Sequence, residues 1–193
     1  MKNLLKIIFI NFFLLTIFAC SEKSGGYQSD SAGKGGSMAR FALAGNYLYA
    51  VTDYNLKIVD IKNVKDPVYK KTVQLSNQIE TLWGNSENLF IGTTTGVLVY
   101  DIADPLNPVK LSEVSHITSC DPVVVQGDTA FYTTNSSNSW CSTGQNMLTV
   151  LDISDLINPK TITEINLTSP RGLGVDGDLL FVCDDGLKVF DKS

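Results

Sequence analysis

The sequence has 193 residues, which suits one domain with a sizeable hydrophobic core. Its 20 acidic residues outnumber the 15 basic ones, and it has a single histidine. This composition excludes nucleic-acid binding through a basic surface and a metal site built from clustered imidazoles, and no motif predicts a cofactor.

Residues 1–19 are predicted to be an export signal. Lys2 and Lys6 precede an apolar run that is too short to cross a bilayer. The run ends in Ile17-Phe18-Ala19-Cys20, which resembles a bacterial lipobox. We therefore expect cleavage before Cys20 and acylation of its thiol, giving a stable lipid anchor at the bacterial cell envelope, in the outer membrane or at the cell surface. The alternative is plain secretion with Cys20 as an ordinary thiol.

The segment 20–37 is rich in Ser, Gly and Lys and is predicted to be a flexible tether. From Met38 onward one short pattern, an apolar run that ends in Asp, recurs at intervals of 41, 51 and 39 residues between the Asp positions. Its four copies are Leu56-Lys57-Ile58-Val59-Asp60, Val97-Leu98-Val99-Tyr100-Asp101, Leu148-Thr149-Val150-Leu151-Asp152 and Leu187-Lys188-Val189-Phe190-Asp191. A fixed period of this size is typical of a propeller or solenoid array.

Each copy is predicted to form four short strands, which in the first copy are 40–44, 47–51, 56–61 and 68–75. Gly45-Asn46, Gly127-Asp128 and Gly177-Asp178 are predicted tight turns between the first two strands. The sequence thus predicts an all-β fold, a β-propeller of about four blades at 38–75, 79–115, 119–167 and 170–193, with the last blade incomplete.

The Asp that ends the third strand of each copy is expected to bond its own downstream backbone. A proline follows seven residues later in three copies, at Pro67, Pro108 and Pro159. A metal site at Asp101 with Asp104, or at Asp152 with Asp155, is the alternative interpretation of these acidic residues. The third copy also carries an insertion at 135–146, on the side where we expect a partner to bind.

Three cysteines remain for the folded part. Cys183 lies in an apolar run and is predicted to be a small core residue. Cys120 and Cys141 fall at neighbouring connections, and we predict that they form a disulfide stabilising the fold by ~3 kcal/mol.

Counting six residues back from the turn positions 45, 86, 127 and 177 reaches Ala39, Glu80, Asp121 and Arg171. These innermost-strand positions should surround the mouth of a propeller channel. Glu80, Asp121, Arg171 and the neighbouring Arg40, with Trp140 and Tyr54 at the rim, form the predicted site for a small polar ligand or a metal ion. The alternative is that the charged groups pair with one another or with water.

Several segments together resemble the LVIVD-repeat proteins, exported lipoproteins of Bacteroidetes-type bacteria. These segments are Gly33–Phe41 (GKGGSMARF), Leu89–Gly96 (LFIGTTTG), Ser115–Asp128 (SHITSCDPVVVQGD) and Gly172–Phe190 (GLGVDGDLLFVCDDGLKVF). The resemblance implies a β-propeller at the cell envelope and no established activity. Members usually continue past the equivalent of Ser193, which favours a truncated sequence. The alternatives are closure of the last blade by an N-terminal strand, or its completion by a partner.

These patterns favour a non-catalytic binding or scaffold protein, anchored in the membrane through its N-terminal lipid, that binds a protein or glycan partner. The alternative function is that of an enzyme or small-ligand carrier that uses the charged channel mouth.

Overall fold

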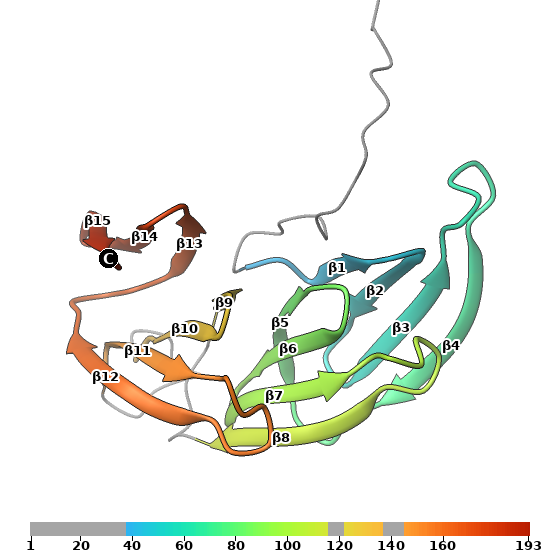
Figure 1. The fold of residues 1–193 in the computed structure, drawn as a ribbon, viewed down its shortest axis with the longest axis horizontal. Coiled ribbons are helices and arrows are strands. Elements are labelled where there is room, and N and C mark those ends of the chain that lie inside the picture. Colours follow the sequence, from blue (N-terminus) through green and yellow to red (C-terminus); the bar gives the residue numbers. More distant parts are fainter. Residues whose placement is uncertain (1–37, 116–121, 137–144) are drawn as a thin grey trace, which may run out of the picture. The chain divides into compact units, whose positions relative to one another are not determined.

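A computed structural model describes residues 38–115, 122–136 and 145–193, and the regular structure in these ranges consists of fifteen β-strands (Figure 1). The strands form four antiparallel sheets, one per sequence repeat, in which strands adjacent in the chain are hydrogen-bonded neighbours. Four β units, the last with three strands, were predicted from the repeats, and this prediction is confirmed.

The first sheet contains β1 (Phe41–Ala44), β2 (Tyr47–Val51), β3 (Asn55–Asp60) and β4 (Val68–Gln74). The second contains β5 (Ile79–Gly84), β6 (Asn88–Thr93), β7 (Gly96–Asp101) and β8 (Val109–Ser115). The third contains β9 (Val123–Gln126), β10 (Thr129–Thr134), β11 (Met147–Asp152) and β12 (Lys160–Asn166). The fourth contains β13 (Gly172–Asp176), β14 (Leu179–Asp184) and β15 (Gly186–Asp191).

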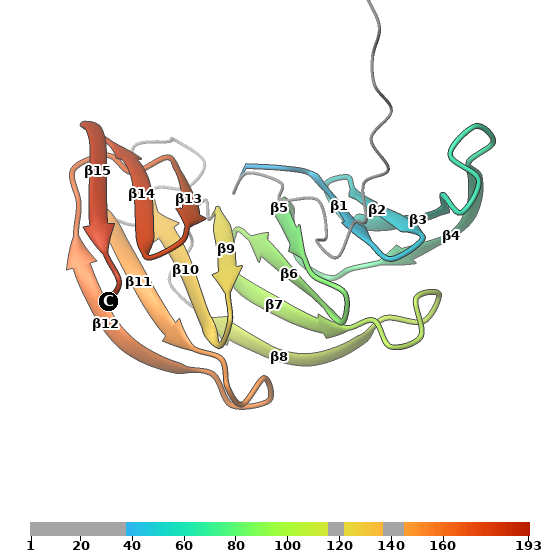
Figure 2. The same ribbon diagram turned by 45° about the horizontal axis from the view of Figure 1, so that its top comes forward.

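Successive sheets meet through their first strands. β1 contacts β5, β5 contacts β9 and β9 contacts β13, and Figure 2 shows these strands following one another. The backbone amide of Leu82 donates to the carbonyl of Ala39 at 2.7 Å, which ties the start of the first sheet to β5. This arrangement places the start of each first strand beside its counterparts in the neighbouring sheets.

Each pair of successive sheets encloses its own hydrophobic core. Because side chains alternate along a strand, every sheet has two faces. We call the face toward the next sheet the forward face and the other the backward face. On the forward face of the first sheet, Tyr49, Leu56 and Ile58 are fully buried. They pack against Leu82 and Leu98 from the backward face of the second sheet.

The turn between the first two strands requires a left-handed backbone in three of the sheets. Gly45, Gly127 and Gly177 have φ of +55°, +56° and +52°, so the predicted glycine turns are confirmed. The second sheet has no glycine there. Instead, the Asn85 side-chain oxygen accepts bonds from the amides of Glu87 and Asn88 at 2.9 and 2.7 Å.

The repeated Asp at the end of the third strand shapes the connection that comes after it. In all four copies its Oδ1 accepts the amide two residues on, as predicted, at 2.6–2.9 Å: Asp60 from Lys62, Asp101 from Ala103, Asp152 from Ser154 and Asp191 from Ser193. These hydrogen bonds lower the pKa of Asp60 and Asp191, and the pKa of Asp152 is lowered first by the Ser154 side chain and then by the Ser154 amide.

The connections that begin at these Asp residues attach each sheet to the one before it. We call residues 61–67, 102–108 and 153–159 the C–D turns. The Tyr49 hydroxyl of the first sheet donates to the Pro105 carbonyl at 3.0 Å. The Ser112 hydroxyl of the second sheet donates to the Leu156 carbonyl at 2.6 Å. Burial, more than the nearby Tyr47 and Asp104, raises the pKa of Tyr49 to about 12, so the hydroxyl remains a donor at neutral pH.

Cys183 is exposed, and the prediction that it is a core residue is wrong. Alternation along β14 buries Leu180 and Val182 against the third sheet and turns Cys183 to the forward face of the fourth sheet. The equivalent Val51 in the first sheet is buried beneath the second sheet. The described residues include no sheet that covers the fourth in the same way.

Candidate functional site

A cavity of about 190 Å³ lies where the innermost strands begin, and Glu80 and Arg171 both line it. Glu80 is half-buried in β5, and Arg171 is exposed just before β13, where its amide donates to the Cys183 carbonyl at 2.8 Å. Asn135 also lines the cavity and donates to the Pro170 carbonyl. Two predicted site residues that are far apart in the sequence, one of each charge, thus share one small cavity.

The other predicted site residues are not part of the described cavity. Arg40 pairs with Asp53 at 3.2 Å, and both side chains are largely exposed, at 46% and 71%. Asp121, Trp140, Cys120, Cys141 and Cys20 lie outside the described residues. The ligand-binding, disulfide and lipidation assignments of these residues therefore stay predictions.

The acidic residues of the C–D turns hold the backbone in place. Asp104 accepts the Leu106 amide at 3.1 Å and the Asn107 side-chain amide at 2.7 Å. The bond from the Asn107 side chain is the main reason that the pKa of Asp104 is lowered. Across the described ranges, His, Cys, Asp and Glu side chains do not gather in threes as a metal site requires. Observed hydrogen bonds thus support the interpretation of Asp101 and Asp104 as turn-forming residues.

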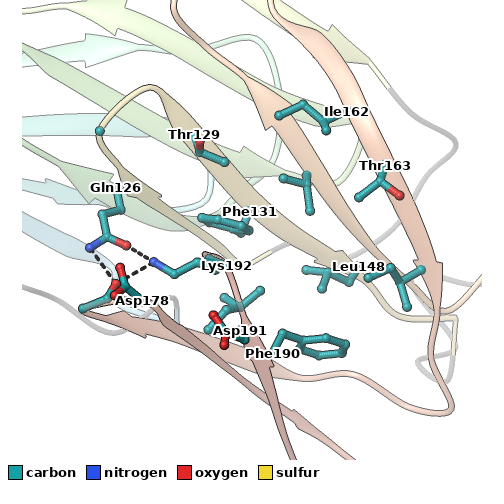
Figure 3. Close-up of a pocket in the computed structure, with 15 residues that line it drawn as sticks. Gln126, Thr129, Phe131, Leu148, Ile162, Thr163, Asp178, Phe190, Asp191 and Lys192 are labelled. Carbon is teal, nitrogen blue, oxygen red and sulfur yellow. Dashed lines mark hydrogen bonds between the residues drawn. The ribbon is translucent and has the colours of Figure 1, made fainter.

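A larger groove, about 510 Å³ in volume, lies between the third and fourth sheets (Figure 3). Its walls are mostly apolar and come from β10, β11, β12, β14 and β15. They include Phe131, Leu148, Val150, Ile162, Ile165, Leu180 and Phe190.

One end of the groove is polar. The Lys192 ammonium donates to the Gln126 side-chain oxygen and, at 2.8 Å, to the Gly177 carbonyl. It also lies 5.8 Å from the centre of the Phe131 ring, a distance at which a cation and an aromatic face attract each other. Lys192 occupies the position of Ile102 and Ile153, which are buried in the first two cores. The groove therefore has a cation where the earlier cores are closed by isoleucine.

The forward face of the fourth sheet is also open. Leu187 and Val189 of β15 are 64% and 51% exposed. Their equivalents in the first sheet, Leu56 and Ile58, are both 0% exposed because the second sheet covers them. The fourth sheet thus presents a core-type apolar surface on the face opposite the groove.

The linker that leads into the fourth sheet is held by Asp184. Its fully buried carboxylate accepts the amides of Thr168 and Ser169 and pairs with Lys188 at 2.6 Å. Burial of the carboxylate opposes its ionisation, but the bonds from Lys188 and the two amides outweigh that effect and hold the pKa of Asp184 at about 2. This cluster fixes one end of the fourth sheet.

The groove was not predicted from the sequence, although a signal was present. Position by position, Lys192 stands where the second and third copies have Ile102 and Ile153. This charged residue at a core position marks the interface between the third and fourth sheets as different from the earlier ones.

Four antiparallel meander sheets that pack in succession through their first strands define a β-propeller, here with four blades of which the last has three strands. The chain carries LVIVD repeats, because the family model for the LVIVD repeat matches residues 35–74 and 142–166. The sequence resemblance to this family is therefore confirmed.

Comparison with solved structures gives one alignment with a TM-score above 0.5, which agrees with this fold. A structure of Kluyveromyces lactis Hsv2 with complete loop 6CD aligns at 18% identity and a TM-score of 0.52, covering 76% of this chain and 44% of that one. A second Kluyveromyces lactis Hsv2 structure aligns at 16% identity and a TM-score of 0.49, and the alignment covers 76% of this chain and 45% of that one. A chain of a Saccharomyces cerevisiae Dbp5 complex with Nup159 and Gle1 aligns at 10% identity and a TM-score of 0.48, and the alignment covers 74% of this chain and 37% of that one.

The present chain spans less than half the length of these solved structures. None of the curated proteins gives a significant match to the sequence. The described residues also contain no helix that is long and apolar enough to span a membrane.

Proposed function

We propose that this chain is a non-catalytic binding or scaffold propeller that is held at the bacterial cell envelope by a lipid on Cys20 and binds a protein partner. The observation that carries the proposal is the exposed apolar surface of the fourth sheet. Leu187 and Val189 occupy positions that are core residues in the first two sheets, yet they face solvent. An apolar patch of this kind marks an interaction surface.

The chemistry of this surface favours a protein over a glycan. The groove on the opposite face of the same sheet is walled mainly by aliphatic and aromatic side chains, and among the described strands β15 forms an edge of its sheet. A polypeptide can satisfy both features, because its side chains fill apolar pockets while its backbone pairs with the edge. A glycan offers no comparable row of alternating donors and acceptors.

A small polar ligand is the second candidate, and the shared cavity of Glu80 and Arg171 favours it. A volume of about 190 Å³ is below the range of most drug-sized ligand pockets. This cavity would therefore take only a small carboxylate or a similarly compact molecule.

Site-specific photo-crosslinking in cells tests the proposed function. A photoreactive residue in place of Val189 should give a discrete crosslinked protein product, because a partner would cover this half-exposed side chain. The same residue in place of Lys62, an exposed position on the first C–D turn, is the matched control and should give none. In the same strain, Cys20→Ser should move the protein from the membrane to the soluble fraction and abolish the Val189 product.

Equal crosslinking at Val189 and Lys62, or none at either, would contradict the binding function of the fourth sheet and leave the Glu80 and Arg171 cavity as the candidate site. Retention of Cys20→Ser in the membrane fraction would contradict the lipid anchor alone.

A further inference from the structure

Positive charge gathers at the outer strand of the first sheet. Residues 60–71 cover the end of β3, the first C–D turn and the start of β4, the outermost strand of its sheet (Figure 1). They hold four lysines and two aspartates, a net charge of +2. The rest of the chain holds 11 basic and 18 acidic residues. One part of the surface of an acidic protein is thus positively charged.

The equivalent segments of the next two sheets carry the opposite charge. Residues 101–112 and 152–163 each hold one lysine and two aspartates, a net charge of −1. We use the name basic patch for the four lysines of the first sheet, all of which stand where both later copies have uncharged residues: Lys62, Lys65, Lys70 and Lys71. Because two sheets fold without a charge at these positions, the fold does not require the lysines.

The positions of the patch are exposed even in sheets that are covered on both faces. The second and third sheets each pack against two neighbours. The residues two and nine positions after their repeated Asp are nevertheless exposed, namely Ala103, Lys110, Ser154 and Thr161. The first-sheet equivalents are Lys62 and Tyr69. Exposure here is therefore a property of the outermost strand and its turn.

Two lysines of the basic patch are held in place by neighbouring side chains. The Lys70 ammonium pairs with Asp60 at 3.3 Å, and the Lys71 ammonium donates to the Asn107 side chain at 2.8 Å. The two lysines of the turn itself are exposed. The patch thus combines positioned charges on β4 with charges on the turn that are open to a partner.

Two exposed residues beside the lysines suit a lipid interface. Val68 and Tyr69 are 45% and 59% exposed. A tyrosine ring has an apolar body and a polar hydroxyl, and such rings are enriched where a membrane meets water. Lysine ammonium groups are attracted to anionic lipid headgroups, and their stems can lie along apolar surface. The chemistry of this surface fits an anionic membrane.

A lipid on Cys20 would bring the basic patch within reach of such a membrane. Cys20 is eighteen residues before Met38, so the connecting chain spans at most about 60 Å when fully extended. A few lysines bind an anionic surface weakly when the protein is free in solution. Attachment to the same membrane raises their effective concentration there, as a polybasic patch does for a single acyl chain.

We propose that the basic patch and Tyr69 dock on an anionic lipid surface, so that the anchored propeller lies with the outer strand of its first sheet against the membrane. The lysines are attracted to the headgroup phosphates, and the Tyr69 ring enters the interface. This inference rests on the proposed lipid anchor and adds the orientation of the anchored protein. Because the patch meets lipid and not protein, Lys62 remains a suitable control for protein crosslinking at Val189.

Fluorescence quenching on vesicles tests the inference. The full chain carries a fluorescent amino acid in place of Tyr69 and is reconstituted into vesicles with quencher-labelled headgroups. The vesicles contain phosphatidylcholine alone, or phosphatidylcholine with roughly one quarter phosphatidylglycerol to give a negative surface potential. We expect quenching to be at least about twofold stronger on the anionic vesicles. This difference should vanish when the ionic strength rises from about 0.1 M to about 1 M, because the Debye length falls from about 10 Å to about 3 Å.

Matched positions in the third sheet provide the controls. A fluorescent residue in place of Thr161, the exposed equivalent of Tyr69, should be quenched equally on both kinds of vesicle. In the chain labelled at position 69, Lys65→Glu should remove at least about half of the difference. Lys160→Glu, the same change of charge at an exposed position of β12, should leave it unchanged. Unchanged thermal unfolding of both variants would show that they remain folded.

Equal quenching at position 69 on the two kinds of vesicle, or equal effects of Lys65→Glu and Lys160→Glu, would overturn the inference. A response of the label at position 69 to soluble poly-glutamate but not to anionic vesicles would identify an acidic polypeptide as the partner and would also overturn it. Fractionation of Cys20→Ser and crosslinking at Val189 are measured separately, so the anchor and the binding function would stand in each case. Retention of Cys20→Ser in the membrane fraction would instead remove the lipid anchor and leave the vesicle result to decide the docking surface.

Discussion

At the residue scale, Asp184 is the side chain on which the position of the fourth sheet most depends. It is the acceptor for two amides of the incoming linker and the partner of Lys188, and its side chain is fully buried. A buried carboxylate with this many donors stabilises its surroundings only while it is ionised.

Asp184→Ala should lower the free energy of unfolding at pH 7 by about 1–3 kcal/mol, because the Thr168 and Ser169 amides lose their acceptor. Chemical denaturation measures the change. Asp185→Ala, at the exposed neighbouring position, is the control and should have little effect. Equal destabilisation by the two variants would show that the hydrogen bonds of Asp184 do not matter.

The same prediction has a pH dependence with a definite sign. The pKa of Asp184 is about 2 in the folded protein, below its ordinary value of 3.8, so the unfolded chain takes up the proton first as the pH falls. Its stabilisation is complete above pH 3.8 and is lost toward pH 2. The difference between wild type and Asp184→Ala should therefore shrink across this window.

At the element scale, Gly96 allows β7 to begin beside β8. Its φ is +158°, and a Cβ at this position would lie 2.4 Å from the Val114 carbonyl oxygen, which belongs to the backbone and cannot rotate away. Gly96→Ala should therefore cost roughly 2 kcal/mol or more of stability.

Gly174, in the middle of β13, is the matched control, because no described atom lies within 4 Å of a Cβ built there. Gly174→Ala should be neutral or should stabilise the protein by about 0.4–1 kcal/mol, because alanine lowers the conformational entropy of the unfolded chain. Thermal unfolding of both variants distinguishes these outcomes. Similar melting temperatures would show that β7 can shift relative to β8 at little cost.

The elements themselves were largely predictable, because local chemistry determines them. The predicted second strand of the first copy, 47–51, coincides with β2, and the third differs from β3 by one residue at each end. Glycine turns and Asp-centred turns depend on nearby residues alone. The exposure of Cys183 was not predictable in this way, because the same apolar strand is buried or open depending on whether another sheet covers it.

The candidate site was likewise predictable in part. Counting within the repeats brought Glu80 and Arg171 together, and the structure places both on one cavity. The groove escaped prediction because strand periodicity does not show which parts of a sheet face another segment covers. Its residues, such as Phe131 and Ile162, look like ordinary core and surface positions in the sequence.

At the scale of the whole molecule, the number of covered faces differs from sheet to sheet. The second sheet is covered on both faces, and all six residues of β6 are buried. Within the part of the chain that the structure describes, the fourth is packed on one face only, and β15 has no fully buried residue. In a repeat array, stability is approximately a sum over units and their interfaces.

Native-state hydrogen exchange should therefore show a gradient along the chain. Because the fourth sheet lacks one interface, its amides in β14 and β15 should exchange at least about tenfold faster than those of β6 and β7, a difference in opening free energy of about 1.4 kcal/mol or more. Exchange followed by mass spectrometry of peptides resolves the sheets separately. The amides that pair β10 with β11 are an internal reference, since the third sheet packs against a neighbour on both faces. Equal protection in all four sheets would mean that the molecule opens as one unit and that the exposed face of the fourth sheet costs it no stability.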